Sequence, residues 1–270
     1  MEFSTIESSF NRAFQYSFSK KKLLLMFFSL AFCGMMIVFF RSLAATSSRW
    51  MMVSLIFLPL LLSSGVLLST GVYFIRVYFH EVKGITFTFR KILGSSWQII
   101  LGVSLIALAP LLFYLFLCIA MGLFLLLQRI PAMGGFISTV FAFAPFIVLL
   151  CFLLLSLFSV LLLFFVAPAA AFEKKKTEQL TRDLIVRIKE NLFLNLLLFF
   201  VGIFPITLLF IILFFALQLT DISFFYPAHA LGYAIRMFFI MLPFTAILTP
   251  SALFFFNFAA ESYNLFLKRE

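Results

Sequence analysis

The chain has 270 residues, of which 64% are hydrophobic and 11% are charged, and its formal net charge is +10. A soluble domain typically carries about 25% charged residues, so we exclude a water-soluble globular fold: a chain of this size cannot hide so much apolar surface from water. The positive charge lies in short connectors beside apolar runs, so its expected partner is anionic lipid rather than nucleic acid.

Six apolar runs are each long enough to cross a bilayer as a helix, which needs about 20 residues. In chain order they cover residues 23–40, 51–75, 97–127, 137–168, 192–217 and 233–257. The third and fourth runs exceed the required length, so those helices are expected to tilt, kink or extend beyond the headgroups. The predicted fold class is therefore an all-α polytopic membrane bundle of six transmembrane helices.

The distribution of basic residues predicts that both termini lie in the cytoplasm. Sixteen of the twenty Lys and Arg residues lie in the N-terminal segment, the connectors after the second and fourth spans, and the C-terminal tail. The other side of the bilayer holds only Arg41, Arg49, Arg129 and Arg236. This alternation follows the positive-inside rule and requires an even number of spans.

The first span has an alternative interpretation as a cleavable signal peptide. Lys20, Lys21 and Lys22 precede its apolar run, and the small residues Ser42 and Ala44 follow it, which is the pattern of a signal sequence. The length of the run and the presence of Arg41 argue against cleavage. Cleavage would leave five spans.

Each cytoplasmic connector contains an amphipathic segment that leads into a span. In the first segment, residues 3–18, apolar side chains that include Phe10 and Phe14 share one helical face, with Arg12 opposite. The second segment covers residues 82–93 and the third covers residues 180–192. An apolar face beside a cationic polar face is typical of a helix that lies in the membrane interface.

The connectors also align with one another. Placing Glu81 on Glu173 puts Arg90 on Arg182, and Glu261 follows a span as these two acids do. The chain is therefore predicted to be one membrane domain of three repeats, each an interfacial helix followed by a two-span hairpin. The repeat units cover about residues 1–79, 80–171 and 172–260, and a short cytoplasmic tail covers residues 261–270.

Three stretches of sequence carry a resemblance to known proteins. They are FNRAFQYSFSKKKLLLMFF, FHEVKGITFTFRKILGSSWQIILG and VAPAAAFEKKKTEQLTRDLIVRIKENLFLNLL. Their order resembles a group of bacterial six-span inner-membrane proteins of uncharacterised function, and is similar to the membrane domain fused to some glycerophosphodiester phosphodiesterases. Pro168 and Glu173 match that pattern, whereas Arg182 and Asp183 stand where the family often has Ser. The resemblance implies a multi-pass protein of the bacterial inner membrane and brings no catalytic residues.

The sequence shows no constellation of catalytic or metal-binding residues. His80 and His229 are expected on opposite sides of the bilayer, as are Asp183 and Asp221, so neither pair can share a site. The three cysteines lie inside apolar runs at no metal-ligand spacing and are predicted to be buried thiols; they are Cys33, Cys118 and Cys151. We therefore expect no cofactor, no metal and no enzymatic activity.

Two groups of residues are candidate functional positions. The first is predicted to contact anionic headgroups and comprises Lys20, Lys21, Lys22, Lys83, Arg90, Lys91, Lys174, Lys175, Lys176 and Arg182. The second contains small or amide side chains that are predicted to pack helices together, with a polar cavity lining as the alternative. It comprises Ser63, Ser64, Gly65, Ser69, Thr70, Gly71, Asn195 and Asn257.

The leading hypothesis is a non-enzymatic inner-membrane protein that acts through contacts with anionic lipid or with a membrane-protein partner. The runner-up is a transporter or channel for a small or lipid-like solute. Seven of the nine prolines lie in spans and the second span is rich in Ser and Gly, features that transporters use to build binding sites.

Overall fold

The computed structural model describes residues 3–44, 47–85, 88–130, 135, 139–140, 142–172, 192–219 and 230–267. These residues form helices without any strand, which confirms the all-α class. Two short elements come first, α1 (Phe3–Gln15) and the 3₁₀ turn η1 (Tyr16–Phe18). Six long helices follow: α2 (Lys20–Ala44), α3 (Arg49–Val82), α4 (Phe89–Leu127), α6 (Ala144–Phe172), α8 (Leu192–Leu219) and α9 (Ala230–Leu267).

All six long helices are long and apolar enough to cross a membrane, so the chain is a multi-pass helical membrane protein. Their bounds follow the six predicted runs, and the largest shift is at the end of the sixth, where the helix continues to Leu267 rather than ending at residue 257. The fourth run shifts at both ends. That helix begins at Ala144 rather than at residue 137 and continues past Pro168 to Phe172. The proline stays inside the helix and is buried, because packed neighbours in a membrane bundle tolerate a helical proline.

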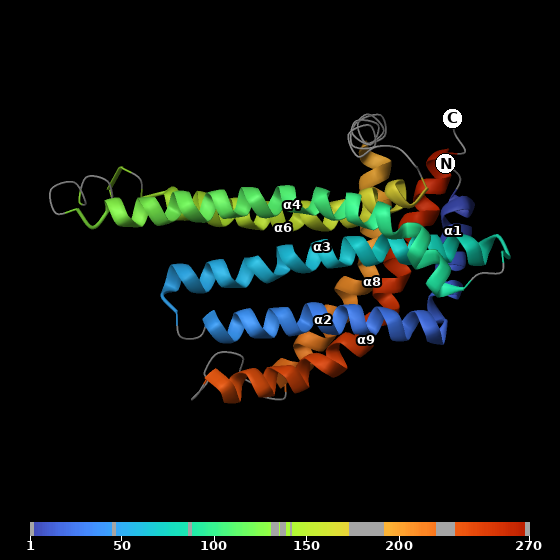
Figure 1. Ribbon diagram of the computed structural model, residues 1–270, viewed down its shortest axis with the longest axis horizontal. Helices are drawn as coiled ribbons and strands as arrows, with labels where there is room; N and C mark the ends of the chain where they lie inside the picture. Colours follow the sequence, from blue (N-terminus) through green and yellow to red (C-terminus); the bar gives the residue numbers. More distant parts are fainter. Residues whose placement is uncertain are drawn as a thin grey trace.

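The long helices are arranged so that both chain ends lie at one end of the bundle, and α1 lies across that same end (Figure 1). We call it the terminal end. Helix α3 packs against α2, α4 and α6, while α9 packs against α1, α2, α6 and α8. In α9, every side chain from Ser251 to Tyr263 is buried. The C-terminal half of α9 therefore forms the centre of the terminal end.

Two separate clusters of buried apolar residues hold the bundle together. The larger one lies at the terminal end and joins all six spans and α1 through residues such as Phe164, Phe199 and Phe256. The smaller one joins α3, α4 and α6 around Tyr114 and Phe152, whose ring centroids are 4.8 Å apart. The terminal end is thus the part of the protein with the most extensive core.

The second predicted amphipathic segment, residues 82–93, is not one helix. Val82 ends α3, and the N–H groups of Gly84 and Ile85 donate to the carbonyls of Glu81 (3.0 Å) and His80 (3.0 Å). This is the hydrogen-bond pattern of a Schellman cap, and Gly84 supplies its left-handed residue with φ of 65°. Phe89 then starts α4, which is a single helix of 39 residues.

The predicted third amphipathic segment, residues 180–192, lies almost wholly outside the described residues, so the threefold repeat stays a prediction. The predicted cytoplasmic tail is partly helical, because α9 continues beyond Glu261 to Leu267. Burial of Glu261 and Tyr263 against the bundle accounts for this extension.

Candidate functional site

The amphipathic helix α1 is docked on the bundle. The ring of Phe10 meets that of Phe254 on α9 edge to face, with 4.9 Å between centroids, and Ala13 is completely buried. Phe14 and Phe18, in contrast, are 51% and 52% exposed. The predicted apolar face is therefore divided between protein contact and a pair of aromatic rings that face outward.

An amide on α9 fixes the end of α1. Asn257 is fully buried, and its Nδ2 donates to Ser17 Oγ at 3.0 Å and to the Ala13 carbonyl at 3.4 Å. The Ser17 hydroxyl donates to the same carbonyl at 2.7 Å. A helix end leaves carbonyls without intrahelical partners, and here side chains satisfy one of them. Asn257 thus joins α1 to α9 rather than lining a cavity.

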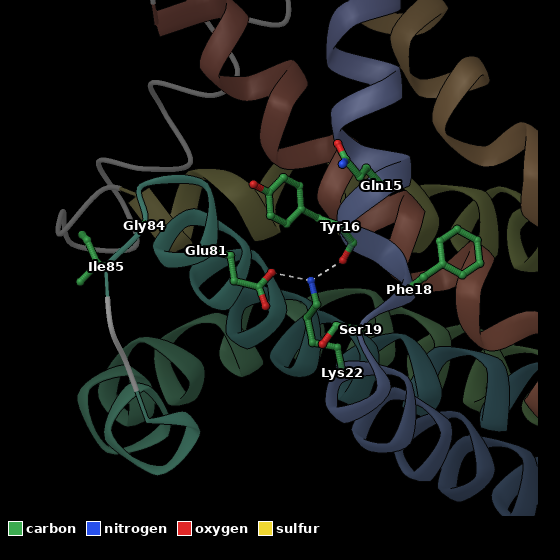
Figure 2. Close-up of a pocket in the computed structure, with 8 residues that line it drawn as sticks. All are labelled: Gln15, Tyr16, Phe18, Ser19, Lys22, Glu81, Gly84 and Ile85. Carbon is green, nitrogen blue, oxygen red and sulfur yellow. Dashed lines mark hydrogen bonds and ion pairs between the residues drawn. The ribbon is translucent and has the colours of Figure 1, made fainter.

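The first buried ion pair involves Lys22, which was predicted to contact headgroups. Instead its side chain is turned inward and is completely buried. Its Nζ lies 2.6 Å from Glu81 Oε2 and also donates to the Tyr16 carbonyl (Figure 2). The η1 turn ends the first helix just before Lys20, so that Lys22 on α2 faces the capped end of α3. A buried charge is tolerated only when it is paired and hydrogen-bonded, and both conditions hold here.

A buried acid on α9, Glu261, lies near the first ion pair. It is 5% exposed; Tyr78 Oη donates to its Oε1 at 2.6 Å, and Arg12 Nη1 lies 3.7 Å away. The rings of Tyr78 and Tyr16 also meet edge to face. Two acids at the ends of two spans, Glu81 and Glu261, therefore each bind a cation from the N-terminal 22 residues.

The other predicted headgroup residues fall into two sets. Lys20, Lys21, Lys83, Arg90 and Lys91 are exposed at the terminal end. Lys174, Lys175, Lys176 and Arg182 lie outside the described residues. Arg76 on α3, which was not among the predicted headgroup residues, contacts protein: its guanidinium donates to Ser96 Oγ at 2.7 Å and to the Ser95 carbonyl at 3.1 Å on α4.

The small residues of α3 lie at contacts between helices. Ser69 hydrogen-bonds Ser104 on α4 at 2.9 Å, and Thr70 accepts from Ser29 on α2 at 3.4 Å. A Cβ on Gly65 would be 3.4 Å from Ala107, and one on Gly71 would clash with the Phe256 ring.

Two further members of the group, Ser63 and Asn195, are buried, and Ser64 is half-buried. Ser63 and Asn195 are each 5% exposed, Ser64 donates to the Leu61 carbonyl, and Ser63 accepts a long contact from Cys33 through its own carbonyl. The pocket described next is lined by none of the residues of this group.

An open depression of about 550 Å³ lies beside the first ion pair. Its walls come from the end of α1, η1, the start of α2 and the capped end of α3 (Figure 2). It is lined by Gln15, Tyr16, Phe18, Ser19, Lys22, Glu81, Gly84 and Ile85. Within the described ranges no group of three His, Cys, Asp or Glu side chains could hold a metal.

Sequence reasoning missed both ion pairs, Lys22–Glu81 and Arg12–Glu261. One signal was present: Glu81 and Glu261 each follow a span in equivalent positions. We took this equivalent placement of the two acids only as evidence for a repeat. An acid at the end of an apolar span, in a chain whose N-terminal segment is basic, is also a candidate for a buried pair.

The fold and the site define a multi-pass helical membrane protein with a charged, partly buried cluster at the end that carries both termini. The chain matches no protein-family model, no curated protein and no solved structure.

Proposed function

We propose that this protein is a non-enzymatic component of the bacterial inner membrane that acts by binding anionic lipid at its terminal end, which we place in the cytoplasm. The supporting observation is the set of five exposed basic side chains there, next to the outward-facing rings of α1. A basic residue near an anionic surface contributes about 1 kcal/mol of attraction, and exposed aromatic rings partition into the interface.

The arrangement of α1 supports the same proposal. The helix lies across the end of the spans (Figure 1). In a bilayer that surrounds such a bundle, we expect this end to lie at the depth where headgroups meet water. The buried contacts of Ala13 and Asn257 hold it there. Phe14 and Phe18 can then insert into the interface without any rearrangement, and a membrane-protein partner would meet the same surface.

The test compares thermal unfolding in nanodiscs of phosphatidylcholine with and without phosphatidylglycerol. We expect the anionic lipid to raise the Tm of the natural chain, and K20Q/K21Q to lose a large part of that rise. The matched control, R129Q/R236Q, removes the same charge from exposed residues at the opposite end. The proposal fails if phosphatidylglycerol does not raise the Tm of the natural chain, or if the two double variants lose the same part of that rise.

A further inference from the structure

The depression beside Lys22 offers a ligand a different charge from the surrounding surface. Lys22 and Glu81 are the two charged residues that line it, so its formal charge is zero. The Lys22 ammonium is completely buried and already donates to Glu81 and to the Tyr16 carbonyl. Glu81 keeps 20% of its side chain exposed. The charge that a ligand meets in this depression is therefore a carboxylate.

Glu81 has acceptor capacity left over. A carboxylate presents about four lone-pair positions to donors, and Lys22 engages Oε2. Glu81 lines the depression and keeps 20% of its side chain exposed, so its carboxylate is accessible to a ligand there. A cationic N–H donor is the group that this carboxylate binds most strongly, because charge-assisted hydrogen bonds are about twice as strong as neutral ones.

The other walls add hydrogen-bond donors and apolar surface. The Ser19 hydroxyl and the Gln15 amide line the same depression and both can donate to an oxyanion. Phe18 and Ile85 are 52% and 48% exposed and form its apolar sides. A ligand that matches these walls has an ammonium, a phosphate a few bonds away, and a hydrocarbon part.

We propose that this depression is a binding site for a zwitterionic phospholipid with a primary ammonium headgroup, of the phosphatidylethanolamine type. The ammonium donates to Glu81, the phosphate accepts from Ser19, and the acyl chains leave along Phe18. This inference rests on the proposed function only in placing the terminal end at headgroup depth.

The proposal distinguishes this lipid from two others. Phosphatidylcholine carries a quaternary ammonium without N–H donors, so it cannot make the hydrogen bond to Glu81. Phosphatidylglycerol brings a negative charge to a pocket whose exposed charge is also negative. The exposed lysines outside the pocket select anionic lipid, whereas the pocket itself selects ethanolamine.

The experiment is competition between lipids of equal acyl length for the purified full chain, with bound lipid counted by native mass spectrometry. We expect phosphatidylethanolamine to be retained over phosphatidylcholine by roughly tenfold, the ratio that one charge-assisted hydrogen bond gives. E81Q is expected to bring the ratio close to one. A ratio near one for the natural chain overturns the proposal.

Two further variants keep the test decisive, because E81Q leaves Lys22 buried without a counter-ion. K22M/E81Q removes the pair together, which buried ion pairs often tolerate, and it is also expected to abolish the preference. I85W fills the depression and leaves the pair intact. If K22M/E81Q or I85W keeps the natural chain's ratio of bound phosphatidylethanolamine to phosphatidylcholine, the proposal is overturned. The control is R236Q, which is remote from the pocket and is expected to leave this ratio unchanged.

The same measurements separate this site from the proposed function. If K20Q/K21Q has no effect on the phosphatidylglycerol response while E81Q abolishes the ethanolamine preference, the proposed function fails and the pocket stands. The opposite result is that K20Q/K21Q loses the rise in Tm with phosphatidylglycerol, while E81Q and the natural chain show the same ratio of bound phosphatidylethanolamine to phosphatidylcholine. In that case the pocket fails and the proposed function stands.

Discussion

Two neighbouring lysines, Lys21 and Lys22, are predicted to respond oppositely to the same substitution. Lys21 is exposed, whereas Lys22 is completely buried and bonded to Glu81 and to the Tyr16 carbonyl. K21Q and K22Q remove the same charge from adjacent positions of one helix. Any difference in the free energy of unfolding therefore reports what each ammonium contacts, rather than net charge or helix propensity.

The size of the difference follows from the contacts. Removing one partner of a buried ion pair costs about 3–5 kcal/mol, because the other charge is left unpaired. Glu81 keeps 20% of its side chain exposed, so hydration recovers part of that cost. We expect K22Q to lower the free energy of unfolding by about 3 kcal/mol and K21Q to change it by less than about 0.5 kcal/mol.

A double-mutant cycle isolates the pair itself. K22M/E81Q removes both charges, leaves no unpaired ion, and is expected to cost about 1 kcal/mol because the Tyr16 carbonyl loses a donor. The sum of the single substitutions K22M and E81Q should exceed this by roughly 2 kcal/mol, which is the coupling energy expected for residues in direct contact.

The assay is unfolding of the purified protein by titration of sodium dodecyl sulfate into dodecylmaltoside micelles, followed by circular dichroism. Equal effects of K21Q and K22Q would refute the burial of Lys22. Additive effects of K22M and E81Q in the cycle would refute the ion pair even if Lys22 proves to be buried.

Two further predictions concern packing, and both use the same unfolding assay. G71A should destabilise the protein by about 1–3 kcal/mol, because the new Cβ would lie 2.3 Å from the buried ring of Phe256. The matched control G34A should destabilise it clearly less, since the new Cβ meets the flexible side chain of Met241. Equal costs for the two substitutions would contradict this packing. Y114F should cost about 1 kcal/mol, because it removes the 2.6 Å hydrogen bond to the Ser54 carbonyl without changing ring volume, and no loss would mean that this bond contributes nothing to stability.

The six spans could be predicted because each depends on a property local to its own sequence. A run of about 20 apolar residues must be helical in lipid, and the six predicted runs became α2, α3, α4, α6, α8 and α9. The exact ends depend on neighbours. Pro168 was expected near the end of its span, yet α6 continues to Phe172 because the following alanines are buried against the terminal-end core.

The ion pairs could not be predicted because they depend on the relative placement of distant elements. Lys20, Lys21 and Lys22 are chemically identical, and sequence alone assigned all three to the interface. Which of them turns inward depends on the η1 turn before α2 and on the cap that ends α3 beside it. Lys22 and Glu81 are 59 residues apart in sequence, so no local pattern connects them.

The basic terminal end therefore contains two kinds of cation with different consequences. Arg12 and Lys22 are bonded to Glu261 and Glu81, and because those acids belong to α9 and α3, the pairs hold the N-terminal segment against the bundle. Lys20 and Lys21 have no such bond among the described residues and stay exposed. The paired cations position α1 and shape the depression, and the exposed ones supply the attraction to anionic lipid. Counting positive charge alone merges these roles, whereas substituting adjacent lysines one at a time separates them.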